Sequence, residues 1–189
     1  EKETTGEILR LQNCSSTGAS PDWWTRVVPN ATPIFKVEGE LGRRGEGMYD
    51  KMNSIGANEV IIESPYHNVQ PEDMGLEQMT RVIQTYRDRI ADLEKDSRLR
   101  YTLVYKNHGT SAGAHYGHPV AHLASTPVIP KRVKEELDGA KQYFAYKERC
   151  LFCDLLREEL RVGSRVILET RHYAAFCPYA SKFPFETWI

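Results

Sequence analysis

Apolar residues recur along this chain in two patterns, one typical of β-strands and the other typical of amphipathic helices. Short apolar runs that stop at glycine, proline or charged residues favour strands, and two helical patterns are interleaved with them. The strand-like runs lie within residues 22–39 (as two short pieces), 58–63, 99–106, 120–130 and 165–170, and the helical patterns cover 75–95 and the residues after Pro130. The chain is therefore predicted to combine several strands with two main helices.

Each predicted helix carries its apolar residues at three- and four-residue spacing, which places them on one face. That face is expected to pack inward, while charged residues such as those of the KRVKEE segment form the solvent face. The inward residues of the first helix are Leu76, Met79, Val82, Ile83, Tyr86, Ile90 and Leu93. Those of the second helix are Val133, Leu137, Ala140, Tyr143 and Phe144.

The length of 189 residues, with 40% hydrophobic and 27% charged side chains, is enough to bury a core as one domain. We expect residues 1–22 to form a flexible N-terminal arm and residues 23–189 to form the domain, with a mobile loop over 39–58. The closing run FPFETWI is apolar. It suggests a partner surface, so we expect a homodimer or one part of a larger protein with two halves.

Charge and cysteine content narrow the class of protein further. A net charge of −1 gives no general reason to expect a nucleic-acid partner, and no apolar run approaches the ~20 residues of a membrane helix. The opening EKETTGEILRLQ is too polar for a signal peptide. Four cysteines, two of them as Cys-x-x-Cys, suit a reducing compartment and a metal site, so we expect a cytoplasmic protein.

The most chemically dense stretch is 107–122, NHGTSAGAHYGHPVAH, which holds four of the six histidines. It connects two predicted strands, and its glycines allow the backbone to approach a ligand closely. Because side chains alternate along a strand, His118, Val120 and His122 are expected to share one face if they belong to the returning strand. Two imidazoles would then flank a valine.

Two groups of residues are candidate metal sites. Cys150 and Cys153 followed by His172 match the spacing of a tetrahedral zinc site, although two ordinary buried cysteines are the alternative. A fourth ligand is not evident, since Cys177 is equally well explained as a small buried residue. His67 and His118 form a second pair at predicted strand ends, but two histidines are too few for a structural zinc.

A series of motifs runs from about Trp23 to Ile189. They are, in order, TRVVPN, EVIIESPYH, NHGTSAGA with the following HP, STPVIP, CLFC and ETRHYAAFCPYASKFPFETWI. In type and order they resemble the galactose-1-phosphate uridylyltransferase family of the histidine-triad superfamily, and they correspond to the first of two similar halves. The resemblance implies an α/β (α+β) fold with a histidine-triad-like antiparallel sheet and two main helices packed on it.

The resemblance also implies a reaction and its substrates. Members of this family transfer a nucleoside monophosphate between a nucleotide sugar and a hexose 1-phosphate in galactose and carbohydrate metabolism, through a nucleotidyl-histidine intermediate. Their nucleophile is the second histidine of an His-Pro-His-x-Gln motif, and Val120 occupies that position here. Valine cannot attack phosphorus. The alternatives are a catalytically silent nucleotide- or zinc-binding module and an adenylyl-transferring relative, such as an ADP-sugar or dinucleoside-polyphosphate phosphorylase.

The site residues that the resemblance implies are only partly the usual ones. Asn107, Gly113 and the nucleotide-contacting Asn30 match the family pattern, whereas His115 replaces a phosphate-binding serine and His122 a phosphate-binding glutamine. We therefore expect these five residues to bind nucleotide or phosphate. His122 is also a candidate replacement nucleophile, although it would lie ~7 Å farther along the strand than the usual one.

Zinc is the cofactor that the resemblance implies. Cys150, Cys153 and His172 match the second metal site of some members, whose last ligand comes from the second half of the protein. His67 and His118 match two ligands of the first site. The cysteine pair that completes that site in the family is missing here, and only the isolated Cys14 precedes the matched motifs.

Overall fold

The computed structural model describes residues 6–14 and 21–189, and the chain divides into two compact units, 1–129 and 130–189. The first unit holds the large sheet and the second holds two helices and a small hairpin. The boundary at Pro130 falls within the range 23–189 that we expected to form one domain. The histidine-rich stretch belongs to the first unit.

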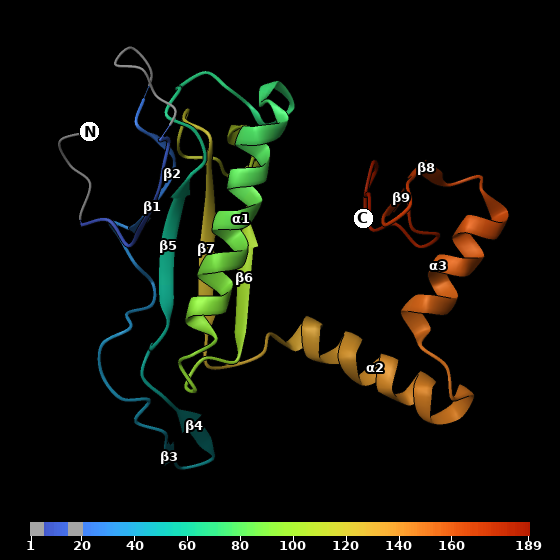
Figure 1. Cartoon of the computed structure of the whole chain (residues 1–189). Coiled ribbons are helices and arrows are strands. Elements are labelled where there is room, and N and C mark those ends of the chain that lie inside the picture. The colour runs from blue at the N-terminus through green and yellow to red at the C-terminus, as the bar shows by residue number, and fades with distance from the viewer. Residues whose placement is uncertain (1–5, 15–20) are drawn as a thin grey trace. The chain divides into compact units, whose positions relative to one another are not determined.

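The first unit is built on a five-stranded antiparallel sheet, as the predicted fold class requires (Figure 1). The strand order is β1-β2-β5-β7-β6, so that β5 and β7 are central and β6 is an edge strand. The strands are β1 (Leu9–Gln12), β2 (Trp23–Pro29), β5 (Ala57–Ile62), β6 (Tyr101–Tyr105) and β7 (Val120–Thr126). The apolar runs over 58–63, 99–106 and 120–130 are confirmed as strands.

Strand β1 lies within the region that we expected to be an N-terminal arm. It pairs antiparallel with β2, and Arg10 forms an ion pair with Asp22 at 2.6 Å. Part of the predicted arm, residues 1–5 and 15–20, lies outside the described residues, so its flexibility stays a prediction. Residues 9–12 nevertheless extend the sheet by one strand.

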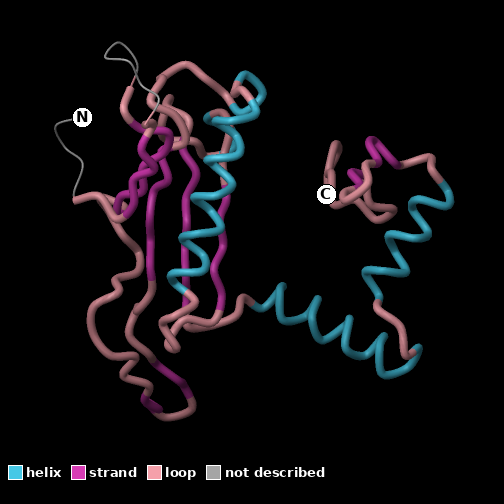
Figure 2. Tube along the Cα trace, in the orientation of Figure 1, coloured by secondary structure: helices cyan, strands magenta, loops and turns pink. Residues whose placement is uncertain are grey.

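Helix α1 (Leu76–Leu93) follows the length of the sheet and covers one of its faces (Figure 2). The core beneath it is made of small and branched apolar side chains from three strands together with Leu93 of the helix. The buried cluster consists of Val27, Ala57, Ile61, Leu93, Ala121 and Leu123. Burial of this apolar face accounts for the packing of α1 on the sheet.

The inward face of α1 differs in part from the predicted one. Val82 and Leu93 are buried as expected, but Leu76 and Ile83 are 86% and 55% exposed. Arg89 is buried instead, because its guanidinium donates to both carboxylate oxygens of Glu59 on β5 at 2.9 and 2.6 Å. A bidentate pair satisfies a buried charge, which hydrophobic spacing alone cannot indicate.

Strand β7 separates the core from the opposite face of the sheet. Its residues alternate between buried and half-buried, and Ala121 and Leu123 belong to the core under α1. Val120 and His122 therefore share the face that points away from α1, as the predicted strand required.

The region over 39–58, predicted as a loop, contains a short hairpin of strands β3 (Arg44–Glu46) and β4 (Tyr49–Lys51). The second strand-like piece of 22–39 does not form a strand of a sheet, since Lys36 makes only an isolated bridge to Ile55. Two prolines, at 29 and 33, interrupt this segment and remove backbone donors that a continuous strand would need.

The second unit contains helices α2 and α3 followed by strands β8 and β9, and α2 packs with α3. These elements are α2 (Lys131–Lys147), α3 (Leu151–Val162), β8 (Val166–Glu169) and β9 (Ala174–Phe176). Helix α2, the second of the two predicted main helices, has no buried residue. Its predicted inward residues Leu137 and Phe144 are 49% and 58% exposed. Sequence analysis did not predict α3.

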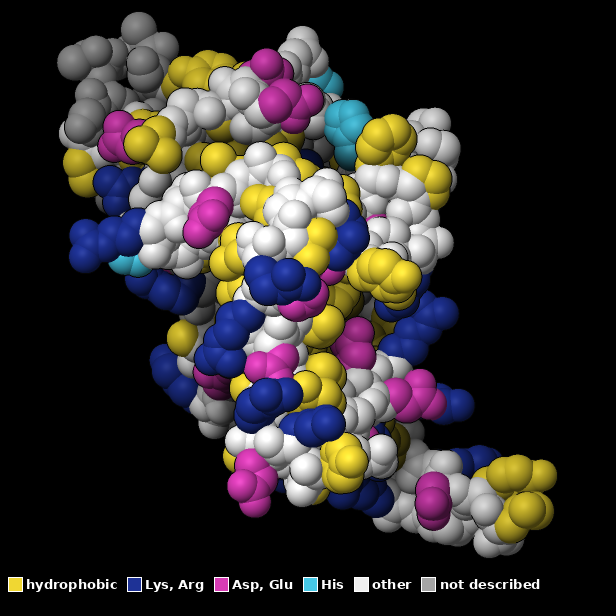
Figure 3. All heavy atoms as spheres, turned by 90° about the vertical axis from the view of Figure 1, so that its right-hand side faces the viewer, with side chains coloured by type: hydrophobic (Ala, Val, Ile, Leu, Met, Phe, Trp, Pro, Cys, Tyr) yellow, Lys and Arg dark blue, Asp and Glu magenta, His cyan; other side chains and the backbone are white. Residues whose placement is uncertain are grey.

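Basic and acidic side chains are interspersed on the face that Figure 3 presents, in keeping with the net charge of −1. Within the described residues, no helix is both long and apolar enough to cross a membrane.

Candidate functional site

A cavity of about 290 Å³ opens beside the loop that connects β6 to β7. Apart from Gln70 and Lys106, all of its lining residues belong to the histidine-rich stretch 107–122. They are Gln70, Lys106, Asn107, His108, Gly109, Thr110, Ala114, His115, Tyr116, Gly117, His118, Pro119, Val120 and His122. The residues of the connection between the two strands thus fold around one cavity.

The lining of this cavity carries basic and neutral groups only. It includes Lys106 and four histidines, and no Asp or Glu is among the lining residues named above. Because nearby positive charge and N–H donors favour an anion, the cavity is suited to phosphate groups.

Lys106 is held at the cavity by a buried carboxylate. Glu63, which is 2% exposed at the end of β5, accepts hydrogen bonds from Lys106 and from the hydroxyl of Tyr86 on α1. The ammonium of Lys106 also lies 3.3 Å from the carbonyl oxygen of Val120. Burial, followed by the charge of Glu63, raises the pKa of Tyr86, so its hydroxyl remains a donor. This network fixes the ends of β5 and β7 relative to α1.

His122 lies half-buried on the cavity side of β7 between two tyrosine rings. Tyr105 stacks on it, with ring centroids 5.4 Å apart and planes inclined by 22°, and Tyr116 lies 6.2 Å away. Burial, and then the charge of His115, lower the pKa of His122 below its usual value near 6.5. The imidazole is therefore neutral at pH 7 and can accept a proton or hydrogen bond.

Two glycines shape the loop that frames the cavity. Gly109 and Gly113 have φ values of 79° and 82°, and they flank a short 3₁₀ helix, Thr110–Ala112. Residues with a side chain rarely adopt this conformation, so these positions favour glycine. A Cβ on Gly113 would also lie 3.6 Å from the amide nitrogen of Asn107, which shows how closely the loop folds back on that residue.

Not all predicted nucleotide-binding residues meet at the cavity. Asn107, His115 and His122 line it, and Gly113 shapes the loop beside it. Asn30 does not line it, because its side chain bonds Asn58 at 3.1 Å and the backbone N–H of Thr32 at 3.1 Å. A nucleoside contact at Asn30 stays a prediction.

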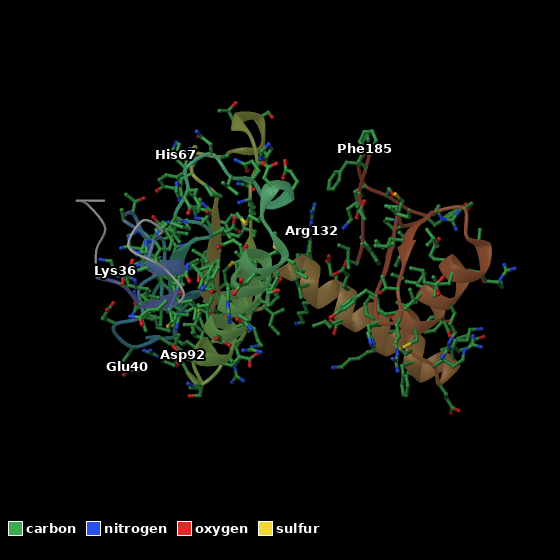
Figure 4. The ribbon with its side chains drawn as sticks, turned by 45° about the horizontal axis from the view of Figure 1, so that its top comes forward. Lys36, Glu40, His67, Asp92, Arg132 and Phe185 are labelled. Carbon is green, nitrogen blue, oxygen red and sulfur yellow. The ribbon has the colours of Figure 1, made fainter. Side chains whose placement is uncertain are left out.

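The side chains of His67 and His118 lie next to each other. Figure 4 labels His67 and, well apart from it, Asp92 near the end of α1. Their Nδ1 atoms are 3.2 Å apart, and the Nε2–H of His118 donates to the carbonyl of Ser64 at 2.7 Å. Two nitrogen ligands of a tetrahedral zinc would be separated by about 3.3 Å. The pair could thus supply two ligands to one metal.

The remaining ligands for such a metal are not in place. No group of three or more His, Cys, Asp or Glu side chains gathers into a metal site within residues 6–14 and 21–189. Cys14 lines a different hollow with Trp24 and Arg81. Two imidazoles alone do not complete a structural zinc site, so metal at His67 and His118 stays a prediction.

Cys150 and Cys153 lie close together at the start of α3. Cys150 is the N-cap residue, and its sulfur accepts a hydrogen bond from the backbone N–H of Cys153 at 3.4 Å. The hydrogen bond from the Cys153 thiol lowers the pKa of Cys150 and raises that of Cys153. His172, in the turn between β8 and β9, does not join them in a three-ligand cluster. The zinc site at Cys150, Cys153 and His172 stays a prediction.

Sequence reasoning did not single out three residues that shape the cavity, namely Tyr105, Lys106 and Tyr116. All three are partly exposed polar or aromatic residues next to the histidine-rich stretch. Alternation along 99–106 places Tyr105 and Leu103 on one face, which was a usable signal for Tyr105. The role of Lys106 depends on Glu63, which is distant in sequence, and no local pattern could reveal that pairing.

Comparison with known proteins extends these observations. The family model for the N-terminal domain of galactose-1-phosphate uridyl transferase matches residues 10–172. ADP-glucose phosphorylase of Arabidopsis thaliana is 30% identical over 191 aligned residues, which cover 100% of this chain and 52% of that protein. Galactose-1-phosphate uridylyltransferase of Thermotoga maritima is 28% identical, with 76% of this chain and 45% of that protein covered.

Solved structures show the same relationship. The crystal structure of the Arabidopsis thaliana ADP-glucose phosphorylase with bound ADP-glucose matches with a TM-score of 0.83 and 30% identity, covering 99% of this chain and 55% of that one. A uridylyltransferase structure matches with a TM-score of 0.79 and 26% identity, covering 86% and 52%. The chain spans about half the length of these relatives. It belongs to the galactose-1-phosphate uridylyltransferase family and corresponds to the N-terminal domain.

Proposed function

We propose that this chain binds the phosphates of a nucleotide sugar or a hexose 1-phosphate in the cavity beside the loop that connects β6 to β7. In this proposal it is the nucleotidyltransferase-type domain of its family, with the site for phosphate retained and the usual covalent step lost. The observation that carries the proposal is the lining of the cavity, which combines Lys106, Asn107 and four histidines without a carboxylate. Such a lining favours an anion over a neutral sugar.

The loss of the covalent step follows from Val120. Its side chain lines the cavity on the same face of β7 as His122. An aliphatic side chain has no lone pair to attack phosphorus, so a nucleotidyl-enzyme cannot form at this residue. His122 lies two residues away, ~7 Å along the strand, and near-attack geometry does not tolerate such a displacement. We therefore assign His122 to phosphate binding and proton acceptance rather than to nucleophilic attack.

The experiment is isothermal titration calorimetry of the purified chain with ADP-glucose, UDP-glucose, glucose 1-phosphate and glucose. We expect the three phosphate-bearing ligands to bind and glucose not to bind. Affinity should fall in Asn107→Ala and stay unchanged in the control Asn53→Ala, since Asn53 lies in the 39–58 region outside the cavity. Absence of binding by all three phosphates, or equal loss in both variants, would contradict the proposal.

A preference for an adenine nucleotide is a second candidate. One relative that aligns over the whole chain is an ADP-glucose phosphorylase, and a solved structure with bound ADP-glucose covers 99% of this chain. These similarities support an ADP-sugar as ligand. Direct competition between ADP-glucose and UDP-glucose in the same titration decides it, and a lower Kd for UDP-glucose would favour the uridylyl reading.

Several further properties belong to the same proposal. Four cysteines without disulfides support a reducing, cytoplasmic location. Large apolar side chains exposed in the second unit, such as Phe183 and Phe185 at 64% and 97%, support a homodimer or a longer protein with a second half. The adjacent thiols of Cys150 and Cys153 support zinc binding with ligands from elsewhere. Mass measurement in solution and metal analysis test these points.

A further inference from the structure

We propose that the cavity hydrolyses the diphosphate of a bound nucleotide sugar by direct attack of water, with His122 as the general base. This inference rests on the proposed binding of a nucleotide sugar. It adds an activity that needs no covalent intermediate, and it assigns the proton-accepting role to a residue whose environment is visible in the structure.

The imidazole of His122 is held in a fixed orientation, and its ring nitrogens are open to a ligand. Its ring stacks on Tyr105 and lies beside Tyr116, so its plane is fixed by contacts from both β6 and the loop. Neither ring nitrogen has a hydrogen-bond partner among residues 6–14 and 21–189. A half-buried imidazole that lines a cavity and leaves both nitrogens open can bond a water molecule there.

The charged groups around His122 favour its neutral form. Tyr105 of β6 and Tyr116 of the loop contact the ring of His122, His115 acts on its charge, and Lys106 and His108 are the other basic residues that line the cavity. No carboxylate is among the lining residues, so nothing anionic from the protein stabilises an imidazolium at rest. His122 is accordingly kept as a neutral base by burial and by His115. A bound phosphate would supply the compensating negative charge when the proton arrives.

The third feature is the space in the cavity next to Val120 and His122. Val120 and His122 are two residues apart on the same face of β7, and both line the cavity. The short valine side chain leaves the room next to His122 open, which a water molecule can occupy. Lys106 and His115 also line the cavity, and their N–H groups are of the kind that donates to phosphate oxygens. A water molecule in this space can therefore act as the nucleophile in place of a side chain of the protein.

Hydrolysis replaces one bond at the α-phosphorus by another. The oxygen of water forms a bond to the α-phosphorus while a proton passes to the imidazole of His122. The bond from the α-phosphorus to the bridging oxygen breaks, and the electron pair leaves with the sugar phosphate. The products are a nucleoside monophosphate and a sugar 1-phosphate, and His122 then releases its proton to solvent. No oxidation or further reactant is involved.

The experiment incubates the full chain with ADP-glucose or UDP-glucose in H₂¹⁸O and follows the products by ³¹P NMR and mass spectrometry. We expect one ¹⁸O atom in the nucleoside monophosphate and none in the sugar 1-phosphate. In His122→Gln the rate should fall by about 10²–10⁴-fold, the usual contribution of a general base. Thermal melting of the variant confirms that it is folded.

A matched pair of variants separates orientation of the base from general destabilisation. Tyr105→Ala removes the ring that stacks on His122, whereas Leu103→Ala alters the same face of the same strand outside the cavity. These residues have similar exposures of 39% and 43%. We expect Tyr105→Ala to lower the rate at least tenfold and to move the acid limb of the pH profile, with Leu103→Ala leaving both unchanged.

The possible outcomes are distinct. Calorimetric binding without release of nucleoside monophosphate overturns the hydrolysis and leaves the proposed binding function intact. Absence of binding overturns the proposed function itself. An unchanged rate in His122→Gln, or ¹⁸O in the sugar 1-phosphate, removes His122 or the α-phosphorus from the mechanism.

Discussion

The two faces of strand β7 are made from one short run of sequence, yet they serve different purposes. Ala121 and Leu123 are fully buried under α1, whereas Val120 and His122 line a cavity on the other side. Alternation of side chains along a strand produces this division without any further device. Adjacent residues of β7 can therefore be tested separately, one set for stability and the other for binding and reaction.

The largest expected effect is on the core face. Leu123→Ala should lower the free energy of unfolding by about 2–5 kcal/mol, because it removes a fully buried side chain and leaves a cavity. Val120→Ala, on the half-buried face of the same strand, should cost under about 1 kcal/mol. Urea denaturation of both variants measures the difference. Equal losses would show that the two faces do not differ as described.

The next effect concerns the charge at the cavity. Lys106→Met should weaken binding of glucose 1-phosphate by about 1.5–3 kcal/mol, or roughly 10–150-fold, because a charged hydrogen bond is lost. Calorimetry gives the Kd.

Lys106 also neutralises the buried Glu63, so the single variant will lose stability as well. The double variant Glu63→Gln with Lys106→Met removes that unpaired charge. It should recover stability without recovering binding. Recovery of both would assign Lys106 a structural role only.

A gain of function probes the cavity face from the opposite direction. Val120→His should restore an imidazole at the position where family members carry their nucleophile, and we expect slow, partial labelling of the chain by a radioactive nucleotide sugar. The adduct should be labile to acid. The melting temperature should change little, since Val120 is only half-buried. The same labelling of the unaltered chain would show that another residue acts as nucleophile.

The degree to which these features could be predicted depends on how local their causes are. Strands β5 and β7 are short apolar runs, and α1 has helical spacing over 18 residues, so their existence follows from the sequence pattern. The buried Arg89 could not be predicted, because its burial depends on Glu59, which is 30 positions away. Spacing within α1 assigns a charged residue to solvent.

The candidate site shows the same limit. The density of histidine and glycine in 107–122 located the cavity, because a single connection between adjacent strands supplies nearly all of its lining. The placement of Asn30 away from the cavity could not be foreseen, since it depends on Asn58 of the neighbouring strand. Helix α3 was missed for another reason. It is a short helix of 12 residues, Leu151–Val162, and its first turn contains Cys153 of the Cys-x-x-Cys motif, a spacing that is also typical of a metal site.

The smallest expected effect is a pH dependence that arises from His122. Its pKa in the folded chain lies below the usual value near 6.5, because of burial and then because of the charge of His115. Above that usual value the imidazole is neutral in both the folded and the unfolded chain, and it contributes no pH dependence. As the pH falls below it, the unfolded chain takes up the proton first, so stability decreases until the folded pKa is reached. The half-exposed ring is screened by water, and the loss should remain well under the ~1.4 kcal/mol of one full pKa unit. Denaturation at pH 7.5 and pH 5.5 should show a slightly greater loss for the unaltered chain than for His122→Gln, which has no imidazole to protonate. A greater loss in His122→Gln would mean that His122 is stabilised as the cation, contrary to its role as a neutral base at the cavity face of β7.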